Sequence, residues 1–122
     1  MKQVRLGQIA FARSGDKGSA ANIGVIPRSP AAYAVIGERL TARRVEEYFR
    51  SMGATDVRRY DWPSLMALNF VLPGVLPGGG SRSPRIDAQG KALGQALLEM
   101  SLEVPDDLPT DPPERSPTRS KR

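Results

Sequence analysis

The sequence contains no cysteine and no histidine. These absences exclude catalysis by a thiolate or an imidazole, zinc sites built on cysteine and histidine, and haem ligation by the usual residues. Catalysis would have to use Lys, Asp, Glu, Ser or Tyr, and a metal would have to be a hard ion held by oxygen atoms. We therefore expect neither a metal nor another cofactor.

Long apolar runs are also missing. The first five residues, Met1-Lys-Gln-Val-Arg5, lack the apolar core and cleavage site of a signal peptide, and no run of about 18 apolar residues could span a membrane. With 122 residues, of which 39% are hydrophobic, the chain can build one domain with a modest core. We expect a cytoplasmic protein without membrane association.

Aromatic residues are few, and the positive charge is dispersed. Residues 1–102 contain fourteen Lys and Arg against eight Asp and Glu, a net charge of +6, and the whole chain has seven aromatic residues. The basic residues are not interleaved with aromatic ones as on a base-stacking surface, which argues against nucleic acid. An anionic small molecule or an acidic partner protein fits this charge about as well.

The end of the chain differs from the rest in composition. Residues 103–122 contain five of the eleven prolines and nine charged residues, but only two large aliphatic residues, Val104 and Leu108. Such a segment has little apolar surface to bury. The sequence therefore predicts one folded domain over residues 1–102 and a disordered, proline-rich charged tail over residues 103–122.

The first half predicts two strands followed by two helices. We expect strands over Val4–Ala12 and Asn22–Ile26, antiparallel because their connection is short. The apolar residues at 9–12 would face either a covering layer or a second copy of the chain, so a homo-oligomer remains open. Ser29 before Pro30 marks the start of a short helix, and Thr41 can cap a second helix, Ala42–Met52, which Gly53 ends.

The second half predicts two more strands and a last helix. Asp56–Trp62 reads as a strand, and Leu65–Leu72 is apolar almost throughout, which is typical of a central strand covered on both faces. Asn69 interrupts this run, and a buried amide needs partners from the backbone or from a ligand. Asp87 can cap a helix over residues 88–101.

The glycine-bearing segment Arg13–Ser19 is the first candidate site. Its glycines allow the chain to curl so that backbone N–H groups point inward and hold an anion. Lys17 adds a positive charge and Ser14 a hydrogen-bond donor, whereas Asp16 would repel an anion unless it pairs with a basic neighbour. The alternative is an ordinary solvated hairpin turn. The order of residues does not match a nucleotide-binding P-loop.

A second glycine-rich segment, residues 73–84, is either a flexible lid or a place of close backbone approach. Arg85 and Lys91 flank the start of the last helix, where an anion could also be held. We expect the two glycine segments to lie close together, with Asn22 and Asn69 on nearby strands. The predicted ligand-binding residues are Arg13, Ser14, Asp16, Lys17, Asn22, Asn69, Arg85 and Lys91.

Several of these motifs together resemble one known family. They are Ala12-Arg-Ser-Gly-Asp-Lys-Gly18 with Asn22, Leu68-Asn-Phe70, Gly78-Gly-Gly80, Arg85-Ile-Asp87 and Gly90-Lys91. This set resembles the AtuA-like ferredoxin-fold domain, the small C-terminal domain of the acyclic terpene utilisation protein AtuA family, which also occurs as a separate chain. The resemblance covers residues 4–102. It implies an α+β, ferredoxin-like two-layer sandwich, with a four-stranded antiparallel sheet and helices on one face.

The resemblance also implies a role in bacterial breakdown of acyclic terpenes or branched acyl compounds. We expect an accessory subunit or ligand-binding domain that works with a larger AtuA-type subunit on an anionic acyl molecule, an acyl-CoA or a terpenoid carboxylate. The alternative is a small enzyme of the lyase or hydratase type, in which Lys17 or Asp16 is the acid–base group. The family implies no particular catalytic residue.

Overall fold

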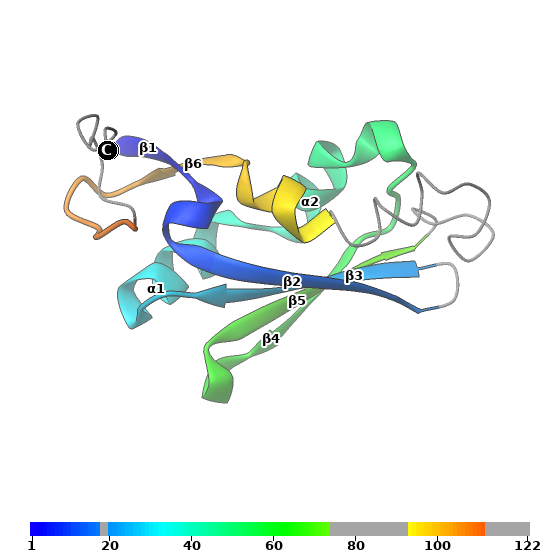
Figure 1. The fold of residues 1–122 in the computed structure, drawn as a ribbon, viewed down its shortest axis with the longest axis horizontal. Helices are drawn as coiled ribbons and strands as arrows, with labels where there is room; N and C mark the ends of the chain where they lie inside the picture. The colour runs from blue at the N-terminus through cyan, green and yellow to red at the C-terminus, as the bar shows by residue number, and fades with distance from the viewer. Residues whose placement is uncertain (18–19, 74–92, 112–122) are drawn as a thin grey trace, which may run out of the picture.

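The computed structural model describes residues 1–17, 20–73 and 93–111. Figure 1 shows how the elements follow one another. They are β1 (Lys2–Arg5), the 3₁₀ turn η1 (Leu6–Gln8), β2 (Ala10–Lys17), β3 (Ala20–Pro27), α1 (Pro30–Arg39), α2 (Ala42–Tyr48), η2 (Arg50–Met52), β4 (Arg58–Trp62), η3 (Pro63–Leu65), β5 (Ala67–Pro73) and β6 (Ser101–Val104). Between β5 and β6, residues 93–98 are helical.

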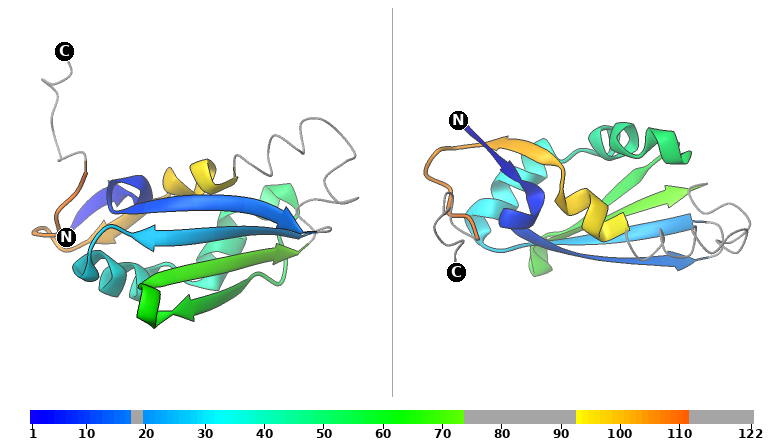
Figure 2. Two further views of the ribbon diagram at one scale, coloured as in Figure 1. Left: turned by 60° about the horizontal axis from the view of Figure 1, so that its bottom comes forward. Right: turned by 45° about the horizontal axis from the view of Figure 1, so that its top comes forward.

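The main sheet has four antiparallel strands in the order β2-β3-β5-β4, and β1 pairs with β6 in a separate two-stranded sheet. Strands β3 and β4 run in the same direction with β5 between them, and α1 and α2 connect them, which is the split β-α-β unit of ferredoxin-like folds. The helices lie on one side of the sheet (Figure 2). The predicted α+β class and two-layer arrangement are confirmed.

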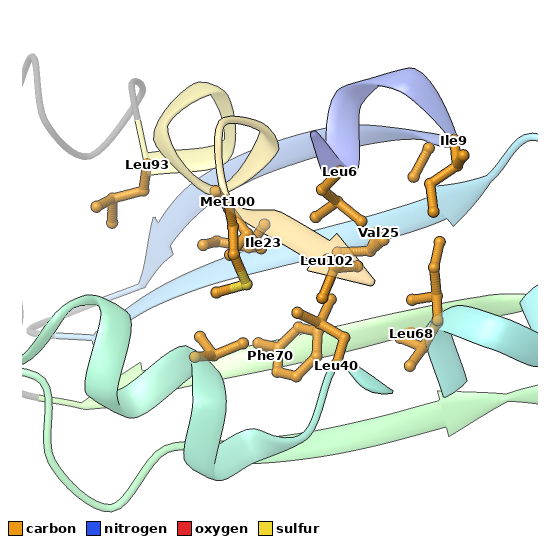
Figure 3. Packing of buried hydrophobic residues seen from close by; sticks show 14 of the residues in the cluster. Leu6, Ile9, Ile23, Val25, Leu40, Leu68, Phe70, Leu93, Met100 and Leu102 are labelled. Atoms are coloured by element: carbon orange, nitrogen blue, oxygen red, sulfur yellow. The ribbon is translucent and has the colours of Figure 1, made fainter. Parts of the chain in front are cut away.

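The core lies between this sheet and the helical layer. Alternate residues of β3 and β5 are buried, and among them Ile23, Val25 and Phe70 are fully enclosed. Figure 3 shows these side chains directed towards Leu6 and Leu40 from the covering elements. Burying one such side chain contributes about 1.5–3 kcal/mol, so this interface supplies most of the drive to fold.

Two of the three predicted helix starts are confirmed in detail, and the third, at Asp87, lies outside the described residues. The Ser29 hydroxyl accepts a hydrogen bond from the Ala32 backbone N–H at 3.1 Å, with Pro30 in the first position of α1. The Thr41 hydroxyl accepts one from the Arg44 N–H, also at 3.1 Å. Each cap satisfies a backbone donor that has no partner inside the helix.

Gly53 ends the predicted second helix, as expected, with φ of 91° in the left-handed region. The end of that helix differs from the prediction, however, because α2 stops at Tyr48 and the chain continues as the 3₁₀ turn η2 up to Met52. Such tightening of the last turn is common where a helix must end under its neighbours.

Two strand predictions were wrong in their extent. The expected strand Val4–Ala12 is divided by η1, because β1 pairs with β6 whereas β2 pairs with β3. The Leu6 N–H donates to the Met100 carbonyl at 2.8 Å, which fixes the turn. Leu65 belongs to the turn η3 and not to the following strand.

The expectation that the strand around Asn69, which is β5, is covered on both faces was also wrong. Burial alternates along β5, with every second residue only partly buried. The strand is central in the sheet, but the described helices cover one face alone. Asn69 is among the partly buried residues, so its amide is not enclosed in the core.

The predicted disordered tail begins too early. Glu103 and Val104 belong to β6, which pairs with β1, and Leu108 is 5% exposed. The Asp111 N–H donates to the Gln8 carbonyl at 2.7 Å, and its carboxylate pairs with Arg28 at 3.0 Å. The two aliphatic residues of this segment are enough to dock it, so residues 103–111 belong to the folded part. Residues 112–122 lie outside the described residues.

Arg59 fastens the edge strand β4 to the end of α1. Its Nη1 donates hydrogen bonds to the carbonyl oxygens of Gly37 and Leu40, at 2.9 and 3.0 Å. Its Nε and Nη2 donate to the two carboxylate oxygens of Asp61, at 2.7 and 2.8 Å. The guanidinium thus satisfies carbonyls that have no partner within the helix. Its hydrogen bonds hold the pKa of the Asp61 carboxyl below its usual value, against the opposing effect of partial burial.

Leu108→Ala tests whether residues after β6 are part of the fold. Removing this buried side chain leaves a gap against the β1–β6 ribbon, so we expect the free energy of unfolding to fall by about 2 kcal/mol. Chemical denaturation measures the change. The neighbouring Asp107 is exposed, and Asp107→Ala should leave stability within about 0.5 kcal/mol of the wild type. Equal stability of the two variants would contradict docking of this segment.

Asp61→Asn tests the contact between Asp61 and Arg59. Because folding lowers the pKa of Asp61, its contribution to stability is present above about pH 4 and is lost as the pH falls through the folded-state pKa. We expect a loss of about 1 kcal/mol near neutral pH that shrinks in acid, measured by urea unfolding. Glu38→Gln, which removes an exposed carboxylate of α1, is the control. A difference that is independent of pH would show that the carboxylate charge is not involved.

Candidate functional site

The face of the main sheet that the helices do not cover carries the candidate site, and we call it the open face. One row of residues crosses all four strands on this face. Arg13 on β2 is opposite Gly24 on β3, Gly24 is opposite Asn69 on β5, and Asn69 is opposite Tyr60 on β4. Residues directly opposite one another in antiparallel strands share a face. The row therefore places a guanidinium, a gap, an amide and a phenol side by side.

A hollow of about 440 Å³ lies in this row, and we call it the Gly24 hollow. The described residues that line it are one charged residue, two residues with amide side chains, Gly24 itself and several apolar residues. Six of the lining residues are Arg13, Asn22, Gly24, Trp62, Leu65 and Asn69.

The hollow exists because Gly24 has no side chain. A Cβ atom at this position would meet only the Arg13 carbonyl oxygen and the Asn69 Oδ1, each at 3.8 Å, which is ordinary contact distance. A larger residue would therefore fit the backbone and fill the space. Glycine in the middle of a central strand weakens it, and such a residue often marks a place where a ligand or another backbone comes close.

The polar groups around the hollow are available for bonding. Within the described part of the chain, no hydrogen bond or ion pair involves the side chains of Arg13, Asn22 or Asn69. An amide presents both a donor and an acceptor, and a guanidinium presents five donors. Together these side chains can bind a carboxylate or another planar anion.

Exposed apolar side chains gather on the same side of the molecule. Eight large apolar residues are exposed in the described ranges, and five of them lie on the open face or in its adjoining turn: Phe11, Ile26, Tyr60, Trp62 and Leu65. Trp62 and Leu65 are 54% and 65% exposed. The Arg28 guanidinium lies 3.9 Å from the centre of the Phe11 ring and covers one end of this face. An apolar centre with basic groups around it is typical of a surface that binds a partner.

The family model of the AtuA ferredoxin-like domain matches residues 4–103. The chain belongs to the AtuA ferredoxin-like domain family. No curated protein and no solved structure matches it significantly. The match covers the sheet, the helical layer and β6 up to Glu103, so the predicted resemblance is confirmed over the folded part of the chain.

In this AtuA ferredoxin-like domain, three of the predicted ligand-binding residues come together. Arg13, Asn22 and Asn69 all line the Gly24 hollow, from β2, β3 and β5. Ser14 lies on the other face of β2, against the helical segment, where its Oγ would lie 3.3 Å from a Cβ at Gly94. The structure therefore separates Ser14 from the other three.

The expectation that Arg13–Ser19 forms a loop that curls around an anion was wrong, because most of this segment is strand. Residues up to Lys17 continue β2, and Asp16 and Lys17 pair with Ala21 and Ala20 of β3. Their backbone groups take part in strand pairing and cannot curl around an anion. The side chains of Asp16 and Lys17, the second glycine segment, Arg85 and Lys91 lie outside the described residues, so the expected approach of the two glycine segments is not tested.

Seven of the described residues that line the hollow were missed by the sequence analysis, among them Gly24, Trp62 and Leu65. Gly24 could have been identified from the sequence, because it is a glycine inside the predicted strand Asn22–Ile26, and such a glycine often marks a place of close approach. Trp62 and Leu65 had no such signal, because only the pairing of β4 with β5 and the turn η3 between these strands bring them into the hollow.

The described part of this domain contains neither a metal-binding cluster nor a membrane-spanning helix. In residues 1–17, 20–73 and 93–111, no group of three or more acidic side chains could hold a metal ion. No helix in those ranges has the length and apolar character needed to cross a lipid bilayer.

Gly24→Val and Gly94→Val form a matched pair that tests whether the Gly24 hollow is open. Valine at 24 meets only ordinary contacts and suits a strand, so stability should stay level or rise by about 0.5–1 kcal/mol. A Cβ at 94 would come within 3.3 Å of Ser14, and the larger side chain should lower stability by about 1–3 kcal/mol. Thermal unfolding compares the two. A loss at Gly24 as large as that at Gly94 would mean that the hollow is not open.

Proposed function

We propose that this domain is an accessory subunit that docks on a larger AtuA-type protein through the open face of its sheet. The observation that carries the proposal is the gathering of exposed apolar side chains, Trp62 and Leu65 foremost, on and beside the sheet face that the described helices leave uncovered. An antiparallel sheet commonly leaves one face in water, but that face is then polar. A gathering of exposed apolar side chains on such a face marks an interaction site.

The charge of the open face supports a partner other than a second copy of the chain. The strand positions of this face carry Arg13 and Arg58 and, among the described residues, no acidic side chain, although Arg58 pairs with Asp56 before the strand at 3.4 Å. Two copies packed face to face would bring together two surfaces whose strand positions carry charges of one sign only, which is unfavourable. An acidic rim on a different protein would complement this surface and speed its association.

Membership of the AtuA ferredoxin-like domain family supports the identity of that partner. In this proposal the larger subunit acts on an acyl compound of acyclic terpene or branched acyl-CoA breakdown, and the small domain completes its substrate site. Arg13 is the only ionisable group among the described residues that line the Gly24 hollow. Since arginine stays protonated, these residues offer no general acid or base, which favours binding over catalysis.

Leu65→Asp tests the docking surface. The chain is co-expressed with the larger AtuA-type protein of the same genome, and the complex is followed by size-exclusion chromatography. Wild type should co-elute with the larger protein, and Leu65→Asp should weaken the complex about tenfold or more, because a charge would be buried against an apolar partner. Leu65 is 65% exposed, so the fold should survive the change.

Ala34→Asp is the control, since it makes the same kind of change at an exposed position of α1 on the helical side. It should leave co-elution unchanged. Failure of the wild-type proteins to co-elute would overturn the proposed function. Loss of the complex with Ala34→Asp but not with Leu65→Asp would place the docking surface on the helices.

A further inference from the structure

We infer that the Gly24 hollow binds a small carboxylate with an apolar body, its charged end at Arg13 and its apolar end against Trp62 and Leu65. The inference deepens the proposed function and rests on it for biological context, because the hollow lies within the face assigned to docking.

The charged end follows from the groups around Gly24. Arg13 lies directly across from Gly24 on one side, and Asn69 lies directly across on the other. Asn22 precedes Gly24 by two residues and points to the same face. These side chains have no hydrogen-bond partner among the described residues, and the described lining of the hollow contains no acidic residue. A carboxylate can accept two hydrogen bonds from the guanidinium and a further one from an amide N–H.

The apolar end follows from the other wall. Ile26, Trp62 and Leu65 line the hollow, and all three are more than two-fifths exposed. Covering them with a hydrocarbon group would remove apolar surface from water. An uncharged apolar ligand would leave Arg13 unused, and a small inorganic anion would leave the apolar wall in water. A molecule with both parts satisfies the whole surface.

The size of the hollow favours a small molecule over an acidic side chain of the partner. Its volume of about 440 Å³ falls within the range of small-molecule sites, about 300–1,000 Å³. One aspartate or glutamate side chain would fill only part of it. The glycine at its centre leaves this room although a side chain would fit there without strain.

Trp62 is the only tryptophan of the chain, so its fluorescence reports on this hollow alone. The isolated full-length chain is titrated with octanoate and, separately, with 1-octanol, which has the same hydrocarbon length and no charge. Octanoate should change the fluorescence in a saturable way, and 1-octanol should bind about tenfold or more weakly, because it cannot use the charged hydrogen bonds of Arg13.

Three variants locate the binding. Arg13→Gln should weaken octanoate binding about tenfold to a hundredfold and bring it near that of 1-octanol. Gly24→Val should abolish binding of both probes while the thermal unfolding midpoint stays level or rises. Arg43→Gln removes an exposed arginine from the helical side and should change neither, which controls for net charge.

The outcomes separate this inference from the proposed function. Equal binding of octanoate and 1-octanol, unchanged affinity in Arg13→Gln, or full binding by Gly24→Val would each overturn the inference. Absence of any fluorescence change with octanoate would also overturn the inference. The described residues of the hollow all belong to this chain, so the isolated chain should bind octanoate without a partner. If the subunit complex then still forms and depends on Arg13, the arginine binds an acidic group of the partner and the proposed function stands. If octanoate binds but no subunit complex forms, the inference stands and the proposed function fails.

Discussion

The burial of alternate residues of β3 and β5 against the helical layer is the constraint on which the rest of this structure depends. Because strand side chains alternate between faces, fixing Ile23, Val25 and Phe70 in the core also fixes which residues stand on the other face. A slip of one residue would put the asparagines and Gly24 into the core, at a large cost in unsatisfied polar groups. The open face is therefore a direct product of core packing, and its composition is set independently of stability.

Because the core does not depend on the side chains of the open face, that face can carry residues that contribute little to folding. Gly24 and two asparagines on central strands are poor choices for a sheet, and nothing in the described chain satisfies the asparagine side chains. Stability comes chiefly from the core and further from the helix caps at Ser29 and Thr41, the hydrogen bonds of Arg59 to the end of α1, and the docking of β6 on β1. A fold supported in these ways can keep one face shaped for binding.

Much of this architecture could be predicted from the sequence, where the signals are local. The hairpin, the two caps and the left-handed glycine each depend on a few neighbouring residues, and all are confirmed. The errors concern contacts between distant residues: β6 pairs with β1 across almost the whole chain, so a proline-rich segment looked unstructured although two aliphatic residues dock it. Of the residues at the candidate site, Arg13, Asn22 and Asn69 could be predicted from their residue types, and the structure brings them together in the hollow. Trp62 and Leu65 could not be found, because only the pairing of β4 with β5 and the turn η3 between these strands place them in the hollow.

In the arrangement we propose, one face serves both a partner protein and a ligand, and this sharing links the two binding events. Trp62 and Leu65 border the hollow and also stand out towards any partner. A ligand that fills the hollow level with the sheet offers the partner a continuous apolar surface, which strengthens docking. A ligand that protrudes holds the partner away and weakens it. Coupling between two binding equilibria is reciprocal, so the ligand that strengthens docking is itself held more tightly in the complex by the same factor. The length of the apolar body thus sets the sign of the coupling, and a hollow whose described lining offers no acid or base can still select which acyl compounds reach the larger subunit.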